Sequence, residues 1–124
     1  MDALKIKETA TMAEQKALQL LDDREEVEKA LKEAEEISFR FRNFEKAGER
    51  IDEMFALVRD YLAGQFSDCT KEDIAVIVGA ALYLANEDDV IPDNVPVLGS
   101  MDDMVIIDSA YKKCENVIKK YKGE

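Results

Sequence analysis

Histidine is absent from the 124-residue sequence, which also contains only two cysteines, two prolines and five glycines. Without histidine the chain has no Ser-His or Cys-His catalytic pair and no imidazole ligand for zinc. Cys69 and Cys114 show no metal-ligand spacing, which favours two ordinary buried thiols in a reduced protein. The scarcity of proline and glycine, together with abundant Ala, Leu, Glu and Lys, favours helix over strand along most of the chain.

The sequence has too few basic residues for a protein that binds nucleic acid or an anionic membrane. Its apolar stretches are also too short for a transmembrane helix. Its 17 basic side chains are outnumbered by 28 acidic ones, giving a net charge of −11 that argues against binding to nucleic acid or to an anionic membrane. The longest apolar stretch, Ile74 to Ala85, spans 12 residues, short of the roughly 20 that cross a bilayer as a helix. Residues 1–10 lack the pattern of a secretion signal, so we expect a cytoplasmic protein.

Apolar residues recur at a spacing of three or four, which predicts an all-α protein. We expect one compact bundle of four to five helices. The periodic positions include Val27 to Phe44, Ile51 to Leu62, and Met104 to Tyr121. Aspartates 22 and 23 can cap a helix, so residues 1–43 form either one helix or two. Aromatic residues at this spacing are expected in the core: Phe39, Phe41, Phe44, Phe55 and Tyr61.

Residues 74–85 are apolar on every side, which is typical of a helix surrounded by others. We therefore expect this helix at the centre of the bundle, where the small residues Ala75, Gly79, Ala80 and Ala81 would permit close helix approach. Thr70 can cap its start, with Asp73 three positions later as in a capping box.

An acidic segment, residues 87–103, separates this helix from the last one. From Glu72 to Tyr111 the chain has nine carboxylates and no Lys or Arg. Pro92 and Pro96 stiffen the segment, and its apolar residues can anchor it to the core. Ser100 and Asp103 repeat the spacing of a capping pair at the start of the final helix.

The acidic segment and its flanks resemble the YkvA-like domain, a small helical bacterial domain of unknown function. The resemblance is carried by residues 82–84 (Leu-Tyr-Leu), 89–93 (Asp-Val-Ile-Pro-Asp), 95–99 (Val-Pro-Val-Leu-Gly) and 102–103 (Asp-Asp). It implies a helical fold and no established activity. Glu87 stands where the family often has a proline, and Asn94 stands where the family usually has a hydrophobic residue. The loop is therefore more polar in this chain, and the resemblance does not imply membrane association for it.

The resemblance is strong over residues 74–110 and leaves the beginning of the chain outside it. We therefore divide the chain into an N-terminal amphipathic helical extension, residues 1–43, and a YkvA-like helical domain, residues 44–124.

Two interpretations of the loop aspartates are open. Asp89, Asp93, Asp102 and Asp103 could converge on a hard divalent cation, namely Mg²⁺, Ca²⁺ or Mn²⁺. Alternatively, each aspartate serves the backbone, in turns or in the first turn of the last helix, and no cofactor is bound. The capping interpretation is the better supported, because aspartates are common at such positions for local reasons.

No nucleophile motif or glycine-rich phosphate loop is present, so an enzymatic role is disfavoured. We expect a non-enzymatic protein-interaction module, with cation binding by the acidic segment as the alternative. The amphipathic N-terminal region could pack on its own bundle, bind a partner helix or bind a second copy of the chain. The acidic surface could steer a basic protein partner.

Overall fold

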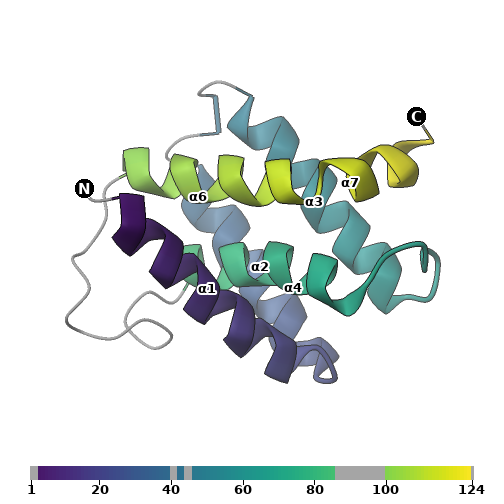
Figure 1. Ribbon diagram of the computed structural model, residues 1–124. Helices are drawn as coiled ribbons and strands as arrows, with labels where there is room; N and C mark the ends of the chain where they lie inside the picture. Colours follow the sequence, from purple (N-terminus) through teal and green to yellow (C-terminus); the bar gives the residue numbers. More distant parts are fainter. Residues whose placement is uncertain (1–2, 40–41, 44–45, 86–99, 124) are drawn as a thin grey trace.

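The computed structural model describes residues 3–39, 42–43, 46–85 and 100–123, without the side chains of residues 3–6, 9 and 100–103. Within these ranges the chain forms helices and no strands, which confirms the all-α prediction (Figure 1). The helices are α1 (Ala3–Leu20), α2 (Arg24–Ser38), α3 (Ala47–Leu62), α4 (Lys71–Ala85), α6 (Ser100–Lys113) and α7 (Glu115–Lys122).

The described residues hold six helices where four or five were expected, and one of the additional breaks lies at Cys114. The apolar spacing predicted one final helix, but it is divided into α6 and α7 there, where the backbone leaves helical geometry (φ −103°, ψ 10°). Near the N-terminus the chain forms two helices. Asp23 caps α2 by accepting a 3.2 Å hydrogen bond from the Glu26 amide, which resolves the alternative left open for residues 1–43.

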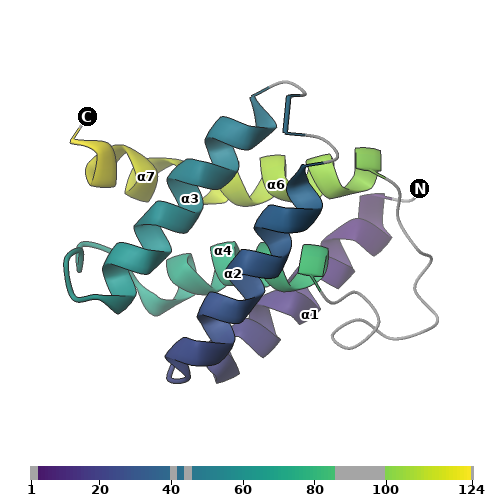
Figure 2. The same ribbon diagram turned by 180° about the vertical axis from the view of Figure 1, so that it is seen from behind.

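Helix α4 is the central element, as its sequence predicted. It packs against α1, α2, α3 and α6, and both views show it between α1 and α2 (Figures 1 and 2). Ten of its 15 residues are buried, from Ile74 to Leu84. Among the helices within the described residues, none combines the length and the apolar character that crossing a bilayer requires.

Helices α1 and α4 approach each other closely at Gly79 of α4. A Cβ atom added at Gly79 would lie 2.9 Å from the backbone nitrogen of Glu14 and 3.0 Å from its Cα atom. Ala13 and Ala17 of α1 are also almost fully buried. Small side chains on both helices therefore allow the two backbones to approach closely, as the small residues of α4 predicted.

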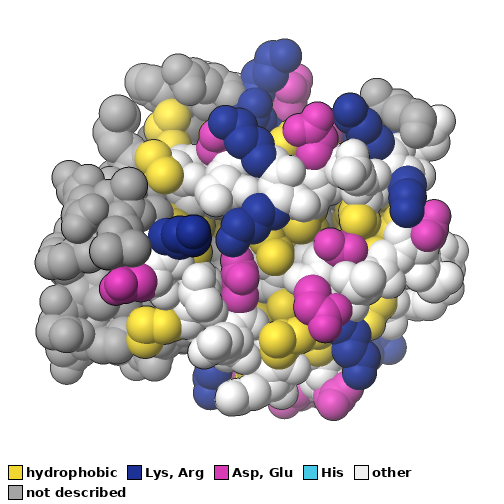
Figure 3. Space-filling model, viewed as in Figure 1, with side chains coloured by type: hydrophobic (Ala, Val, Ile, Leu, Met, Phe, Trp, Pro, Cys, Tyr) yellow, Lys and Arg dark blue, Asp and Glu magenta, His cyan; other side chains and the backbone are white. Residues whose placement is uncertain are grey.

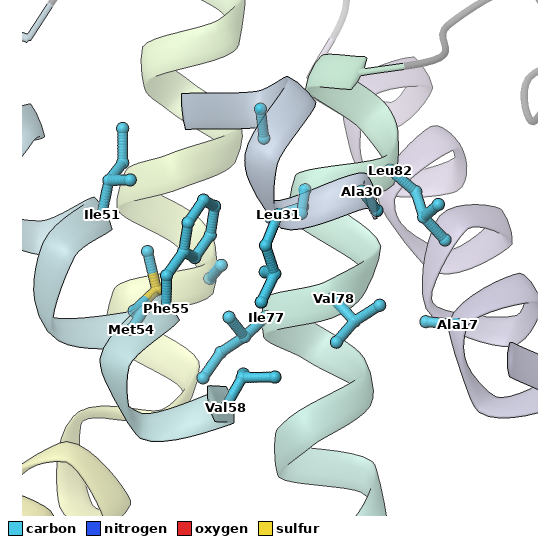
Figure 4. Close-up of a cluster of buried hydrophobic side chains, with 14 of the residues drawn as sticks. Ala17, Ala30, Leu31, Ile51, Met54, Phe55, Val58, Ile77, Val78 and Leu82 are labelled. Carbon is cyan, nitrogen blue, oxygen red and sulfur yellow. The ribbon is translucent and has the colours of Figure 1, made fainter. Parts of the chain in front are cut away.

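The two N-terminal helices share one hydrophobic core with the rest of the chain. Figure 4 shows Ala17 of α1 and Leu31 of α2 in the same cluster as Phe55 of α3 and Ile77 of α4. The division at residues 43 and 44 stays a prediction about domain limits, and the core extends across it.

The expected burial of the aromatic residues is confirmed in one case and wrong in another. Phe55 is fully buried and Tyr61 is half-buried, whereas Phe39 is 76% exposed. Helix α2 ends at Ser38, so Phe39 no longer continues the buried helical face. Phe41 and Phe44 lie outside the described residues.

Replacing Gly79 with alanine tests the close contact of α1 with α4. Alanine in a helix interior usually stabilises a protein by about 1 kcal/mol relative to glycine. Here the new methyl group would meet the α1 backbone, so we expect the free energy of unfolding to fall by about 1–3 kcal/mol. Urea denaturation measures the difference, and a stabilised Gly79→Ala variant would contradict the contact.

Candidate functional site

The acidic segment lies between two described helix ends. Helix α4 ends at Ala85 and α6 begins at Ser100, and both ends lie on the same side of the bundle (Figure 1). Asp89 and Asp93 fall outside the described residues. Asp102 and Asp103 occupy the first turn of α6, but their side chains are not described. The convergence of the four carboxylates on a cation therefore stays a prediction.

The other predicted capping pair, at the start of α4, is confirmed. The Thr70 hydroxyl accepts a 3.1 Å hydrogen bond from the Asp73 amide, and the Asp73 carboxylate accepts a 3.1 Å bond from the Thr70 amide. The reciprocal bonds satisfy two backbone donors that the helix cannot pair internally. Ser100 and Asp103 have the same spacing, but α6 begins at Ser100 itself whereas Thr70 precedes α4, so the capping interpretation of Asp103 stays a prediction.

In the part of the chain that the structure describes, no group of three carboxylate or thiol side chains is placed to hold a metal ion. Several carboxylates instead bind cationic side chains. Arg59 of α3 donates to Glu28 at 3.0 Å and to both oxygens of Glu35 at 2.6 and 3.2 Å. Hydrogen bonding to Glu35, above all, raises the pKa of Arg59. This network joins α3 to α2 and has a structural role that the local sequence pattern did not predict.

The two cysteines are poor candidates for chemistry. Burial raises the pKa of the Cys114 thiol to about 12, and Cys114 Sγ lies 3.5 Å from the Asp73 carbonyl oxygen. Burial also raises the pKa of Cys69, which is half-buried. Both thiols are therefore protonated at neutral pH, and the protonated form is neither an effective nucleophile nor a metal ligand. Both cysteines were expected to be buried, and the structure confirms this for Cys114 but not for the half-buried Cys69.

A narrow depression lies between α1 and α6, with α4 as its floor. Glu14 of α1 and Lys113 of α6 form an ion pair of 2.9 Å beside Gly79 and Ala110. The volume of this partly open hollow is about 10 Å³, room for about one water molecule. The depression is therefore too small to hold a substrate.

The outward face of α1 carries exposed apolar side chains that the sequence interpretation did not single out. Met12 is 37% exposed and Leu18 is 43% exposed, and both lie on the side of the helix away from Ala13 and Ala17. The signal available in the sequence was the low charge of residues 9–21, which include only two charged side chains. The stretch is thus less charged than the chain as a whole, in which 36% of the residues are charged.

Two tyrosines connect the C-terminal helices to α3. The Tyr111 hydroxyl of α6 donates a 2.9 Å hydrogen bond to Glu53, and the Tyr121 hydroxyl of α7 donates to Asp60. The bond to Asp60, with burial as a smaller cause, raises the pKa of Tyr121 to about 12. Burial, followed by the bond to Glu53, raises the pKa of Tyr111.

Comparison with known protein families gives a match to part of the chain. Residues 73–107 match a family described as a protein of unknown function (DUF1232). The match covers most of α4 and the first half of α6, a minority of the 124 residues. It supports a small domain of unknown function and overlaps the region that resembles the YkvA-like domain, but that name is not confirmed. No curated protein and no solved structure matches the chain.

Asp103 and Asp73 provide a matched test of capping against cation binding. If Asp103 caps α6, Asp103→Ala and Asp73→Ala each lower the free energy of unfolding by about 1 kcal/mol, and added Mg²⁺, Ca²⁺ or Mn²⁺ leaves the melting temperature unchanged. We expect this result. If the aspartates form a cation site, the added cation would instead raise the melting temperature of the original protein and of Asp73→Ala, but not that of Asp103→Ala.

Tyr121 predicts a loss of stability in alkaline solution. The folded state holds the Tyr121 hydroxyl proton more tightly than the unfolded state. The contribution of the Tyr121–Asp60 bond to the free energy of unfolding is therefore fully present below the usual tyrosine pKa of about 10, and it is lost as the pH rises to about 12. The melting temperature should therefore fall more steeply over this range in the original protein than in Tyr121→Phe. Asp60→Asn removes the carboxylate and should also flatten the fall. Equal slopes in all three proteins would disprove the role of the bond.

Proposed function

We propose that this chain is a non-enzymatic protein-interaction module that associates with a second copy of itself through the outward face of α1. The observation that carries the proposal is the exposure of Met12 and Leu18 on a helix whose other side is buried in the core. A partner that covers these side chains would remove apolar surface from water.

The charge distribution favours a second copy at this face. Two chains with a net charge of −11 repel each other, so a stable contact requires a surface with little negative charge. In residues 9–21 the charged side chains are Glu14, which is paired with Lys113, and Lys16, which is exposed and opposite in sign to the whole chain. Between Thr11 and Gln19 the face can therefore be buried without bringing unpaired carboxylates together, and the exposed Glu8 lies one turn earlier, at its edge.

The spacing of exposed residues suits contact between two helices. The exposed residues Thr11, Met12, Leu18 and Gln19 lie three or four positions from exposed Gln15, so the five form a broad stripe along α1. Such a stripe can lie along the same stripe of a second helix, and uncharged Gln side chains can hydrogen-bond across the contact. Figure 3 shows yellow apolar side chains reaching the surface on this side of the molecule, among white and charged ones.

A non-enzymatic role is consistent with the chemistry of the described residues. The chain has no histidine, and the raised pKa values of both thiols leave them protonated. The alternative function, binding of Mg²⁺, Ca²⁺ or Mn²⁺ by Asp89, Asp93, Asp102 and Asp103, also stays a proposal, and the Asp103 and Asp73 variants separate it from capping.

Self-association is tested by sedimentation equilibrium over a range of protein concentrations. We expect a concentration-dependent dimer, and we expect the double variant Met12→Glu, Leu18→Glu to raise its dissociation constant about tenfold or more, because two apolar contacts are lost and charges are added. Added salt should strengthen the dimer of the original protein by screening its net charge.

Val105→Glu is the matched control, since Val105 has a similar exposure, 46%, but belongs to α6 and not to α1. It should leave the dimer intact. A monomer at all concentrations, or equal weakening by Val105→Glu, would refute the proposal. Circular dichroism of each variant confirms that it remains helical.

A further inference from the structure

A cleft between α3, α6 and α7 collects positive charge in this acidic protein. Its lining residues are Arg50, Tyr111, Glu115, Ile118, Lys119 and Lys122, and its volume is about 270 Å³. The lining side chains include three cations and one carboxylate, whereas the whole chain has a net charge of −11. Figure 3 shows dark blue Lys and Arg side chains over α6 and α7, with magenta Asp and Glu side chains among them.

Arg50 is held in position at one wall of this cleft. Its guanidinium lies over the Tyr111 ring, with its central carbon 5.0 Å from the ring centre, and it donates to Asp108. The Tyr111 hydroxyl is directed to Glu53, which fixes the ring. A guanidinium has five donors in a planar fork, a geometry that matches the oxygens of a phosphate group.

The lysines of α7 supply further positive charge. The Lys119 Nζ atom lies 3.4 Å from Glu115 Oε1, and the Lys122 Nζ atom lies 3.0 Å from Glu53 Oε1. The side chains of Lys119 and Glu115 are at least half exposed, and ion pairs of this kind contribute little free energy. A dianion in the cleft would therefore compete with Glu115 for Lys119 and with Asp108 for Arg50.

We propose that the cleft lined by Arg50, Lys119 and Lys122 binds a phosphate group, either as free phosphate or as part of a small phosphomonoester. The four lining charges sum to +2, with Asp108 and Glu53 paired to Arg50 and Lys122 beside the cleft, and the buried side chain of Ile118 gives it an apolar wall. The volume is close to the lower limit of about 300 Å³ for small-molecule pockets, which fits a ligand of few atoms. The cleft involves none of the exposed residues of α1, so it is independent of self-association.

Two neighbouring lysines provide the test. Lys119 and Lys120 are adjacent on α7 and their side chains are equally exposed, at 56% each, but Lys119 lines the cleft whereas Lys120 lies 3.8 Å from Asp68. We expect Lys119→Gln to weaken phosphate binding about fivefold, the effect of losing one exposed charge contact. Lys120→Gln should bind like the original protein.

Binding is measured by nuclear magnetic resonance titration at constant ionic strength, once with inorganic phosphate and once with O-phosphoserine. Saturable shifts of backbone amides of α7 and of residues near Arg50 support the proposal. Equal affinity for both probes identifies the phosphate group alone as sufficient, and tighter binding of phosphoserine indicates a phosphomonoester. Absence of saturable shifts with both probes, or equal weakening by Lys119→Gln and Lys120→Gln, would overturn it.

Discussion

The close contact of α1 with Gly79 of α4 is the constraint on which the rest of the bundle depends. With glycine at this position, the α1 backbone comes close enough to bury Ala13 and Ala17 against the central helix. The arrangement leaves the other side of α1 on the surface, where Met12 and Leu18 are exposed. The same packing contact therefore produces both the covered centre of the protein and the face proposed for self-association.

Ion pairs and hydrogen bonds from tyrosine hydroxyls connect the helices outside that core. Arg59 joins α3 to α2, Glu14 and Lys113 join α1 to α6, and Tyr121 joins α7 to α3. Partners in these contacts are 24 to 99 residues apart in sequence. Being partly exposed, each contributes a modest free energy, and together they fix the orientation of the helices more than they drive folding. Glu53 of α3 likewise accepts from Tyr111 of α6 and pairs with Lys122 of α7.

Local physical signals were sufficient for much of this fold. Apolar spacing predicted the helices, the apolar sequence around Gly79 predicted the central element, and Thr70 with Asp73 predicted a helix start that the hydrogen bonds confirm. The same signals failed at Phe39, because periodicity does not show where a helix ends, and at Cys114, because apolar spacing continues across a break. The aspartates at 89 and 93 lie outside the described residues, so the candidate cation site rests on sequence alone.

By itself, then, the sequence determined an all-helical chain with α4 buried at its centre, because helical period and burial follow from the order of apolar side chains. Only the tertiary structure decided which charged residues meet and which apolar residues stay exposed. Pairs such as Glu14 with Lys113, and the cleft around Arg50 and Lys119, depend on distances between helices remote in sequence. Those distances are set by how closely helices pack, and no local pattern records them.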